Sequence, residues 1–119
     1  MTNLRRAVGA YGERVAERYL TEAGLIVLDR NWRCAEGEID LVLRDGPDLV
    51  FCEVKTRRGG AYGRPAEAIR PAKVRRLRRL ATLWLARADV HPRDVRFDVV
   101  EVLPQLRGAS QVEHIRAAF

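Results

Sequence analysis

Two apolar runs of similar length flank one short turn sequence, and this arrangement most strongly constrains how the chain folds. The runs cover residues 37–42 and 51–55, and the segment Asp45-Gly46-Pro47-Asp48 lies between them. Gly, Pro and Asp residues favour a reversal of the chain, each through its own backbone preference. The two runs are therefore predicted to pair as a β-hairpin whose register follows from the turn.

Charged residues interrupt the apolar pattern of this hairpin, and three of them are predicted to converge. Asp40 on the first strand and Glu53 on the second are equally far from the midpoint of the turn. Opposed residues on an antiparallel pair point to the same face, with Cβ atoms about 5 Å apart, so the two carboxylates are expected to converge. Lys55 joins them, because residues two apart on a strand share a face.

Converging carboxylates indicate a cation site. Two such groups repel each other, and they stay ionised at neutral pH at low cost only if a cation lies between them. Hard oxygen ligands suit Mg²⁺ or Mn²⁺, which can polarise a phosphoryl oxygen and lower the pKa of a bound water. Asp40 and Glu53 are thus predicted metal ligands of a phosphodiesterase. Lys55 is expected either to stabilise charge in the transition state or to position and deprotonate the water.

The order Ile39-Asp40, turn, Glu53-Val54-Lys55 resembles the core of the PD-(D/E)xK, or restriction-endonuclease-like, nuclease superfamily, with Ile39 in place of the proline. From Gly9 to about Val102 the chain is similar to the bacterial YraN-type family. The matching segments are Gly12-Glu13-Arg14-Val15-Ala16, Gly37-Glu38-Ile39-Asp40-Leu41, Glu53-Val54-Lys55-Thr56-Arg57 and Arg96-Phe97-Asp98-Val99-Val100.

This resemblance implies a fold and an activity. Members of the YraN-type family resemble archaeal Holliday-junction resolvases in fold and motif order, which implies a restriction-endonuclease-like fold and a metal-dependent nuclease acting on branched DNA. In the resolvases a glutamate on the first helix adds a further acid to the metal site. Glu13 is the matching position, so the resemblance implies a catalytic role for it.

Basic residues gather directly after the second hairpin strand. The chain carries a net charge of +6. The segment from Arg57 to Arg79 contains nine Arg and Lys residues and a single acid, Glu67. A phosphate backbone that crosses the site would meet this surplus. The predicted nucleic-acid contacts are Arg57, Arg58, Lys73, Arg75, Arg76 and Arg79. Lys73 lies on the inward stripe of the predicted helix, where it could reach the active site or extend outward into solvent. The alternative interpretation is a solvated helical face, which is the usual meaning of a charge run.

Hydrophobic periodicity predicts the remaining elements. Apolar residues at spacings of three and four indicate a first helix that ends at Gly24 and a second from about Pro71 to Ala88. Strands are predicted from about Leu25 to Trp32 and over residues 95–102, and a short edge strand over 111–115. Residues 58–65, which include Tyr62, are predicted to form a loop. Helix, three strands, helix and strand form a mixed α/β sheet in one domain spanning residues 1–119.

Asp98 lies on the otherwise apolar face of the predicted strand 95–102. An isolated buried carboxylate is costly, so this residue needs a partner. A structural ion pair or a supporting role near the site is favoured over direct metal ligation. Cys34 and Cys52 are predicted to be free thiols, because two cysteines with two scattered histidines make a poor zinc site.

Composition also bears on location and partners. No apolar run approaches the roughly 20 residues that span a bilayer, and the first 20 residues lack the apolar block of a signal peptide. A cytoplasmic protein that binds DNA and no membrane is expected. Symmetric cleavage of a junction would require a two-fold dimer, although no heptad pattern indicates one.

Three classes of function remain open from the residues alone. The leading hypothesis is a metal-dependent nuclease. The main competitor is a nucleic-acid-binding module that keeps the fold without turnover and shares the basic surface. The third is a protein-interaction adaptor in which these charges are ordinary surface ion pairs.

Overall fold

The computed structural model describes residues 2–57 and 70–119. Its elements are α1 (Thr2–Glu22), β1 (Ile26–Cys34), β2 (Gly37–Asp45), β3 (Asp48–Thr56), α2 (Pro71–Arg87), β4 (Val95–Leu103) and β5 (Gln111–Ile115). The predicted order of helix, three strands, helix and strand is confirmed, and the edge strand over residues 111–115 is also present. The predicted loop at residues 58–65, with Arg58 and Tyr62, lies outside the described residues.

The five strands form one mixed sheet in the order β1-β2-β3-β4-β5. Strands β3 and β4 run parallel, and every other neighbouring pair is antiparallel. The parallel pair needs a crossover connection, and α2 lies within it. The chain therefore has the predicted α/β class, and the arrangement is compatible with a restriction-endonuclease-like fold.

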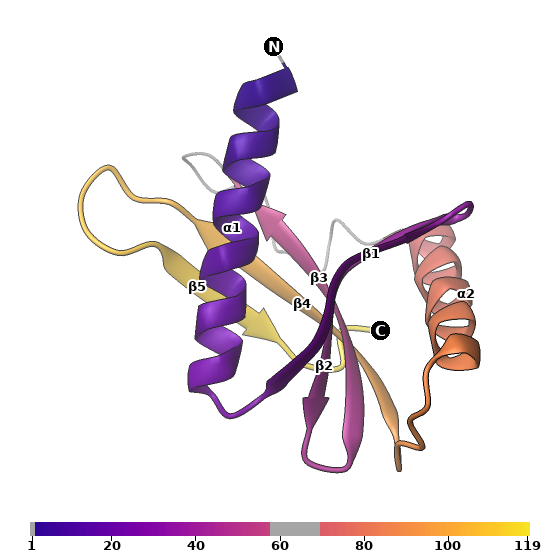
Figure 1. The fold of residues 1–119 in the computed structure, drawn as a ribbon. Coiled ribbons are helices and arrows are strands. Elements are labelled where there is room, and N and C mark those ends of the chain that lie inside the picture. Colours follow the sequence, from indigo (N-terminus) through magenta and orange to yellow (C-terminus); the bar gives the residue numbers. More distant parts are fainter. Residues whose placement is uncertain (1, 58–69) are drawn as a thin grey trace.

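The two helices pack on opposite faces of the sheet (Figure 1). Alternation along β3 separates the two cores, because successive side chains on a strand point to opposite faces. Val50 and Cys52 belong to the core beneath α1, whereas Leu49 and Phe51 belong to the core beneath α2. The alternate residue Glu53 continues the row of Leu49 and Phe51 and so lies on the α2 face.

The β2–β3 hairpin has the register that the turn predicts. Its ladder runs from Asp45 opposite Asp48 to Leu41 opposite Cys52. Gly46 has φ of 60°, a left-handed conformation that glycine adopts without strain. The local turn chemistry therefore sets which side chains of β2 and β3 share a face.

Helix α2 presents an apolar stripe to the sheet and arginines to solvent, as its periodicity predicts. Its buried residues are Leu77, Leu80, Ala81 and Trp84. Arg75, Arg76 and Arg79 are exposed.

Neither of the two described helices is long and apolar enough to cross a membrane. Cys34 and Cys52 are free, as predicted.

Gly12 is the point where α1 approaches the sheet most tightly. A Cβ atom at this position would lie 1.7 Å from Oγ1 and 2.9 Å from Cβ of Thr56, the last residue of β3. Rotating the threonine side chain moves the oxygen but not the Cβ atom, so the backbone of one element would have to shift. Helix α1 can therefore pack on the end of β3 only with glycine at position 12.

We expect Gly12→Ala to lower the free energy of unfolding by about 1–3 kcal/mol, the usual cost of overpacking, despite the better helix propensity of alanine. Gly9→Ala is the matched control, because nothing lies within 4 Å of a Cβ at Gly9. This control should raise stability by up to about 1 kcal/mol. Urea unfolding of both variants measures the difference. Equal stabilities would show that α1 does not pack this closely on Thr56.

Candidate active site

The hairpin opens at the position of Asp40. The β2–β3 ladder ends with Leu41 opposite Cys52, so Asp40 and Glu53 are the next pair in register but lie just beyond it. The Oδ2 atom of Asp40 instead accepts a hydrogen bond from the backbone N–H of Val54, at 2.8 Å. The predicted register is thus correct. The two carboxylates are not a pair within the ladder, however, because Asp40 bonds to the backbone of Val54. The strands separate here because a side chain replaces the next backbone partner.

A polar pocket of about 190 Å³ lies at this opening. Asp40 and Glu53 line it from the two strands, and Leu77 and Leu80 of α2 form apolar parts of its wall. The remaining lining residues are Glu38, Lys73 and Arg76. Acids from the sheet thus face cations from the helix across a small volume.

Asp40 holds its proton unusually tightly. Burial, followed by the nearby charges of Glu53, Glu13 and Glu38, raises the pKa of this carboxyl to about 7, although the hydrogen bond from Val54 opposes the rise. Near neutral pH the group is therefore close to half protonated. A carboxyl that is buried beside other carboxylates becomes fully ionised when a cation neutralises the cluster.

Lys73 supplies one such cation from within the chain. Its Nζ atom lies 2.7 Å from Oε1 of Glu53, and the two side chains are 32% and 16% exposed. Sequence analysis assigned Lys73 to nucleic-acid contact, whereas its position on the inward stripe of α2 brings it into the pocket. Lys73 therefore belongs to the same cluster as the hairpin acids.

Lys55 lies beside this pair on β3. Burial lowers the pKa of its ammonium group, and the charge of Lys73 lowers it further, while Glu53 acts in the opposite direction. A lysine with a lowered pKa gives up its proton more readily than an exposed one. This property suits the role of Lys55 in deprotonating the water, whereas charge stabilisation requires the protonated ammonium.

Glu13 on α1 interacts electrostatically with acids of the site. Burial raises the pKa of its carboxyl, a hydrogen bond from the Asn31 side chain lowers it, and the charge of Glu38 raises it. Glu13 does not line the pocket, but its charge contributes to the raised pKa of Asp40. The structure therefore places Glu13 within electrostatic reach of Asp40.

Glu38 is an acid of the pocket that sequence analysis did not assign. It precedes Asp40 by two residues on β2, so the alternation of side chains along a strand already indicates that they share a face. Its carboxylate also forms an ion pair with Arg33, at 2.9 Å. Glu38 thus adds negative charge to one side of the pocket.

The acids fit a small divalent cation that retains waters. Among residues 2–57 and 70–119, no three His, Cys, Asp or Glu side chains form a group that could hold a metal ion by themselves. Mg²⁺ usually keeps several waters and binds through one or two carboxylates plus substrate phosphates. Asp40 and Glu53 line the same pocket, and the charge of Glu53 helps to raise the pKa of Asp40. Two acids this close to each other are suited to this mode of binding.

The predicted nucleic-acid contacts divide into groups. Arg76 lines the pocket, and Arg75 lies exposed on the same helix. Arg79 is ion-paired with Glu36, and Arg57 donates to the buried Glu101 at 2.5 Å. Arg58 lies outside the described residues. Arg76 and Lys73 are therefore the members of the predicted set that lie beside the acids.

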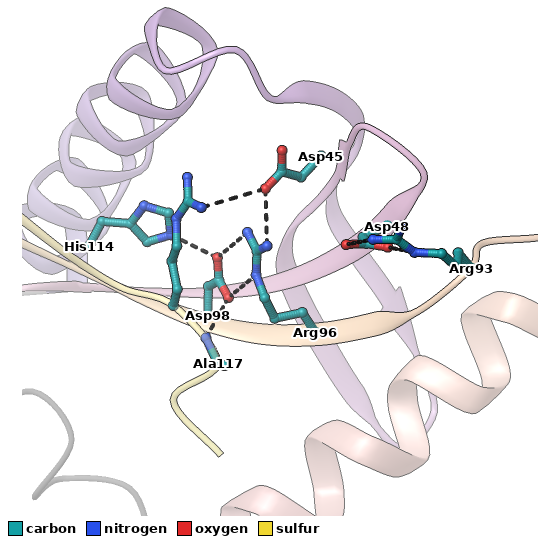
Figure 2. Close-up of polar contacts among 8 residues, drawn as sticks. Asp45, Asp48, Arg93, Arg96, Asp98, His114 and Ala117 are labelled. Carbon is teal, nitrogen blue, oxygen red and sulfur yellow. Dashed lines mark hydrogen bonds and ion pairs between the residues drawn. The ribbon is translucent and has the colours of Figure 1, made fainter.

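Asp98 lies away from the pocket, within a structural network on the α1 face. Figure 2 shows its carboxylate between Arg96 and His114. Arg96 donates at 2.8 and 3.0 Å, His114 Nε2 lies at 2.7 Å, and the backbone N–H of Ala117 donates at 3.0 Å. The predicted structural ion pair is confirmed. The partner His114 lies on β5, where no sequence spacing indicated it.

Comparisons with known proteins identify relatives of almost the same length. Residues 12–102 match a family described as "Uncharacterised protein family UPF0102". A UPF0102 protein of Beutenbergia cavernae is 60% identical over 110 residues, covering 92% of this chain and 93% of the relative. A UPF0102 protein of Frankia alni is 58% identical over 113 residues, covering 95% and 94%. These names identify a family and not a reaction.

Proposed function

The chain belongs to the UPF0102 family, and we propose that it is a divalent-metal-dependent nuclease that hydrolyses phosphodiester bonds of DNA. The observation that carries this proposal is the pocket in which Asp40 and Glu53 lie together while Lys73 and Arg76 face them. The resemblance of the Asp40, Glu53 and Lys55 motif to the PD-(D/E)xK superfamily supports it. The resemblance to archaeal Holliday-junction resolvases favours branched DNA as the substrate.

In this proposal Asp40 and Glu53 hold Mg²⁺ or Mn²⁺, and Glu13 assists electrostatically. A bound ion of this kind supplies charge stabilisation at the phosphoryl group and a water of lowered pKa. Lys55, whose pKa is lowered, accepts a proton from the attacking water or stabilises the charge that develops on phosphorus. Lys73 and Arg76 bind phosphate oxygens from the helix side of the pocket.

The test is a cleavage panel with Mn²⁺ or Mg²⁺ on branched, single-stranded and duplex DNA, with RNA substrates of the same shapes. We expect cleavage of DNA, strongest on branched substrates, and complete loss of cleavage when EDTA removes the metal. DNA binding without cleavage across all metals and shapes would instead support a non-catalytic nucleic-acid-binding module. The ion pair between Lys73 and Glu53 favours that second candidate, because it neutralises one acid without a metal.

Metal binding by the proposed site should depend on pH around neutrality. Because the pKa of Asp40 is raised to about 7, its carboxyl must lose a proton before it can serve as an anionic ligand. We expect Mn²⁺ affinity to fall about tenfold per pH unit below pH 7 and to level off above pH 8. Calorimetric titration with Mn²⁺ between pH 5.5 and 8.5 measures this. A flat profile would exclude Asp40 as a ligand.

A further inference from the structure

A second surface feature lies on the opposite side of the sheet from the pocket. A groove of about 430 Å³ runs between α1 and the start of β5. Its lining residues are Tyr11, Arg14, Val15, Arg18, Tyr19, Glu22, Ala109, Ser110 and Val112. It lies on the α1 face, whereas the acids of the pocket lie on the α2 face, so the two sites do not share a wall.

Two tyrosine rings stand in this groove with substantial exposure. Tyr11 is 39% exposed and Tyr19 is 42% exposed. The hydroxyl of Tyr11 lies 2.6 Å from Oγ of Ser110, and the ring of Tyr19 meets the ring of His114 edge to face at 6.3 Å. Each ring is therefore anchored to β5 or the segment before it, while part of its surface stays open to a ligand.

The spacing of the rings matters for the kind of ligand. Residues eight apart on a helix are separated by about 12 Å along its axis. That is several times the roughly 3.4 Å between stacked bases of a duplex strand. A ligand that contacts both rings must therefore be an extended chain with separated flat groups, and a single strand whose bases are unstacked has this form.

Cations lie between the rings. Arg14 and Arg18 occupy the same stripe of α1, and neither forms an ion pair with another residue in the described part of the chain. By contrast, Arg30 on the neighbouring flank is paired with Glu17 through two hydrogen bonds. Among the residues that the structure describes, Glu22 is the only acid that lines the groove. Along the groove, the partly exposed tyrosine rings thus flank two arginines whose charges are not neutralised by ion pairs within the described residues.

We propose that this groove binds a single-stranded segment of nucleic acid, with bases stacked on Tyr11 and Tyr19 and phosphates held by Arg14 and Arg18. Non-sequence-specific binding of single strands uses this combination of a basic groove and stacking platforms. An acidic peptide would match the arginines but would leave the separated ring faces unused. The choice of nucleic acid as the ligand rests on the proposed nuclease function, for which the groove would hold an unpaired arm of the substrate.

The test measures the affinity of the full chain for a fluorescein-labelled oligo-dT of 12 nucleotides, in EDTA, by fluorescence anisotropy. Tyr19→Ala should weaken binding by roughly 5- to 150-fold, the range for loss of one stacked base. Tyr19→Phe keeps the ring and should retain the affinity of the wild type. This second variant separates stacking from any general effect on folding, which thermal unfolding of both variants also monitors.

The arginines are tested through salt. Each phosphate contact on a single strand contributes roughly 0.7 to the slope of log affinity against log salt concentration. The double change Arg14→Gln and Arg18→Gln removes two such contacts, so it should reduce the magnitude of this slope by about 1.4. Arg30→Gln is the matched control, because the charge of Arg30 is already neutralised by its ion pair with Glu17. That control should leave the slope nearly unchanged.

Two results would overturn the proposal. One is an oligo-dT affinity that neither Tyr19→Ala nor the double arginine change alters. The other is self-association of the wild type that Tyr19→Ala abolishes while oligo-dT affinity stays constant, because this would assign the groove to a second copy of the chain. Since EDTA excludes metal chemistry, failure of this binding test is distinct from failure of the cleavage panel.

Discussion

Asp40→Asn should abolish metal-dependent cleavage of DNA while leaving DNA binding intact or tighter. Asparagine keeps the shape of the side chain, and its carbonyl oxygen can still accept the hydrogen bond from Val54. What it removes is the anionic group that would hold the metal in the proposed mechanism. Because a bound metal contributes several kcal/mol of transition-state stabilisation, we expect a loss of at least about 10³-fold in kcat/KM. Glu53→Gln should have the same effect.

Glu38→Gln is the matched control for these variants. Glu38 lines the same pocket from the same strand, but its carboxylate is already paired with Arg33. Its removal should change cleavage far less than removal of Asp40. Asp40→Asn should also leave thermal stability unchanged or raise it above pH 7, because the buried ionised carboxylate is itself costly. Equal cleavage by wild type, Asp40→Asn and Glu53→Gln would reject the assignment.

The parts of the site that sequence predicted are those set by local chain reversal. The turn at residues 45–48 determines the β2–β3 register, and the register determines that Asp40 and Glu53 are neighbours. Alternation along a strand then adds Lys55 on β3, and the same rule indicates that Glu38 on β2 shares the face of Asp40. Such inferences need only turn chemistry and the two-residue period.

The parts that sequence did not predict depend on how distant elements pack. The ion pair between Lys73 and Glu53 requires the axial position of α2 on the sheet, which periodicity does not specify. Periodicity predicts that Lys73 lies on the inward stripe, but it does not decide whether the side chain reaches the active site or extends into solvent. The opening of the hairpin at Asp40 does not follow from the sequence, for another reason. Propensity rules do not anticipate a carboxylate that replaces a backbone acceptor.

The same division applies to the α1 face. Alternation on β4 correctly placed Asp98 on an apolar face and required a partner for it. Arg96, two residues away on the same strand, was available from sequence as that partner. His114 and the N–H of Ala117 were not, because they arrive only when β5 pairs with β4.

Asp98→Ala should cause the largest loss of stability that any single change in the sheet produces through polar contacts. Asp98 is fully buried, and its carboxylate accepts from Arg96, His114 and the N–H of Ala117. Removing one partner of a buried ion pair costs about 3–5 kcal/mol when the other charge is left uncompensated. Arg96 keeps a second partner, Asp45, at 3.0 Å, so we expect a loss near the lower end of this range. The free energy of unfolding in urea measures this loss. Asp98→Asn keeps the volume and should show an intermediate loss.

The contribution of Asp98 should also depend on pH in a defined direction. Burial raises the pKa of this carboxyl, but the hydrogen bonds from His114, Arg96 and Ala117 outweigh burial and lower it below the ordinary value of 3.8. The stabilisation is therefore complete above about pH 4, where the unfolded chain is ionised, and is lost as pH falls through the lower folded pKa. The difference in stability between wild type and Asp98→Ala should accordingly narrow below pH 4.

Glu17→Ala is the control for both measurements. It removes a carboxylate that also accepts two hydrogen bonds from one arginine, Arg30, but on the surface, where the side chains are 58% and 30% exposed. Solvent screening limits such a pair to about 1 kcal/mol or less. The two ion pairs are similar in their hydrogen bonds and differ mainly in their exposure to water. Equal losses in the free energy of unfolding for Asp98→Ala and Glu17→Ala would therefore show that the network on β4 and β5 is not buried.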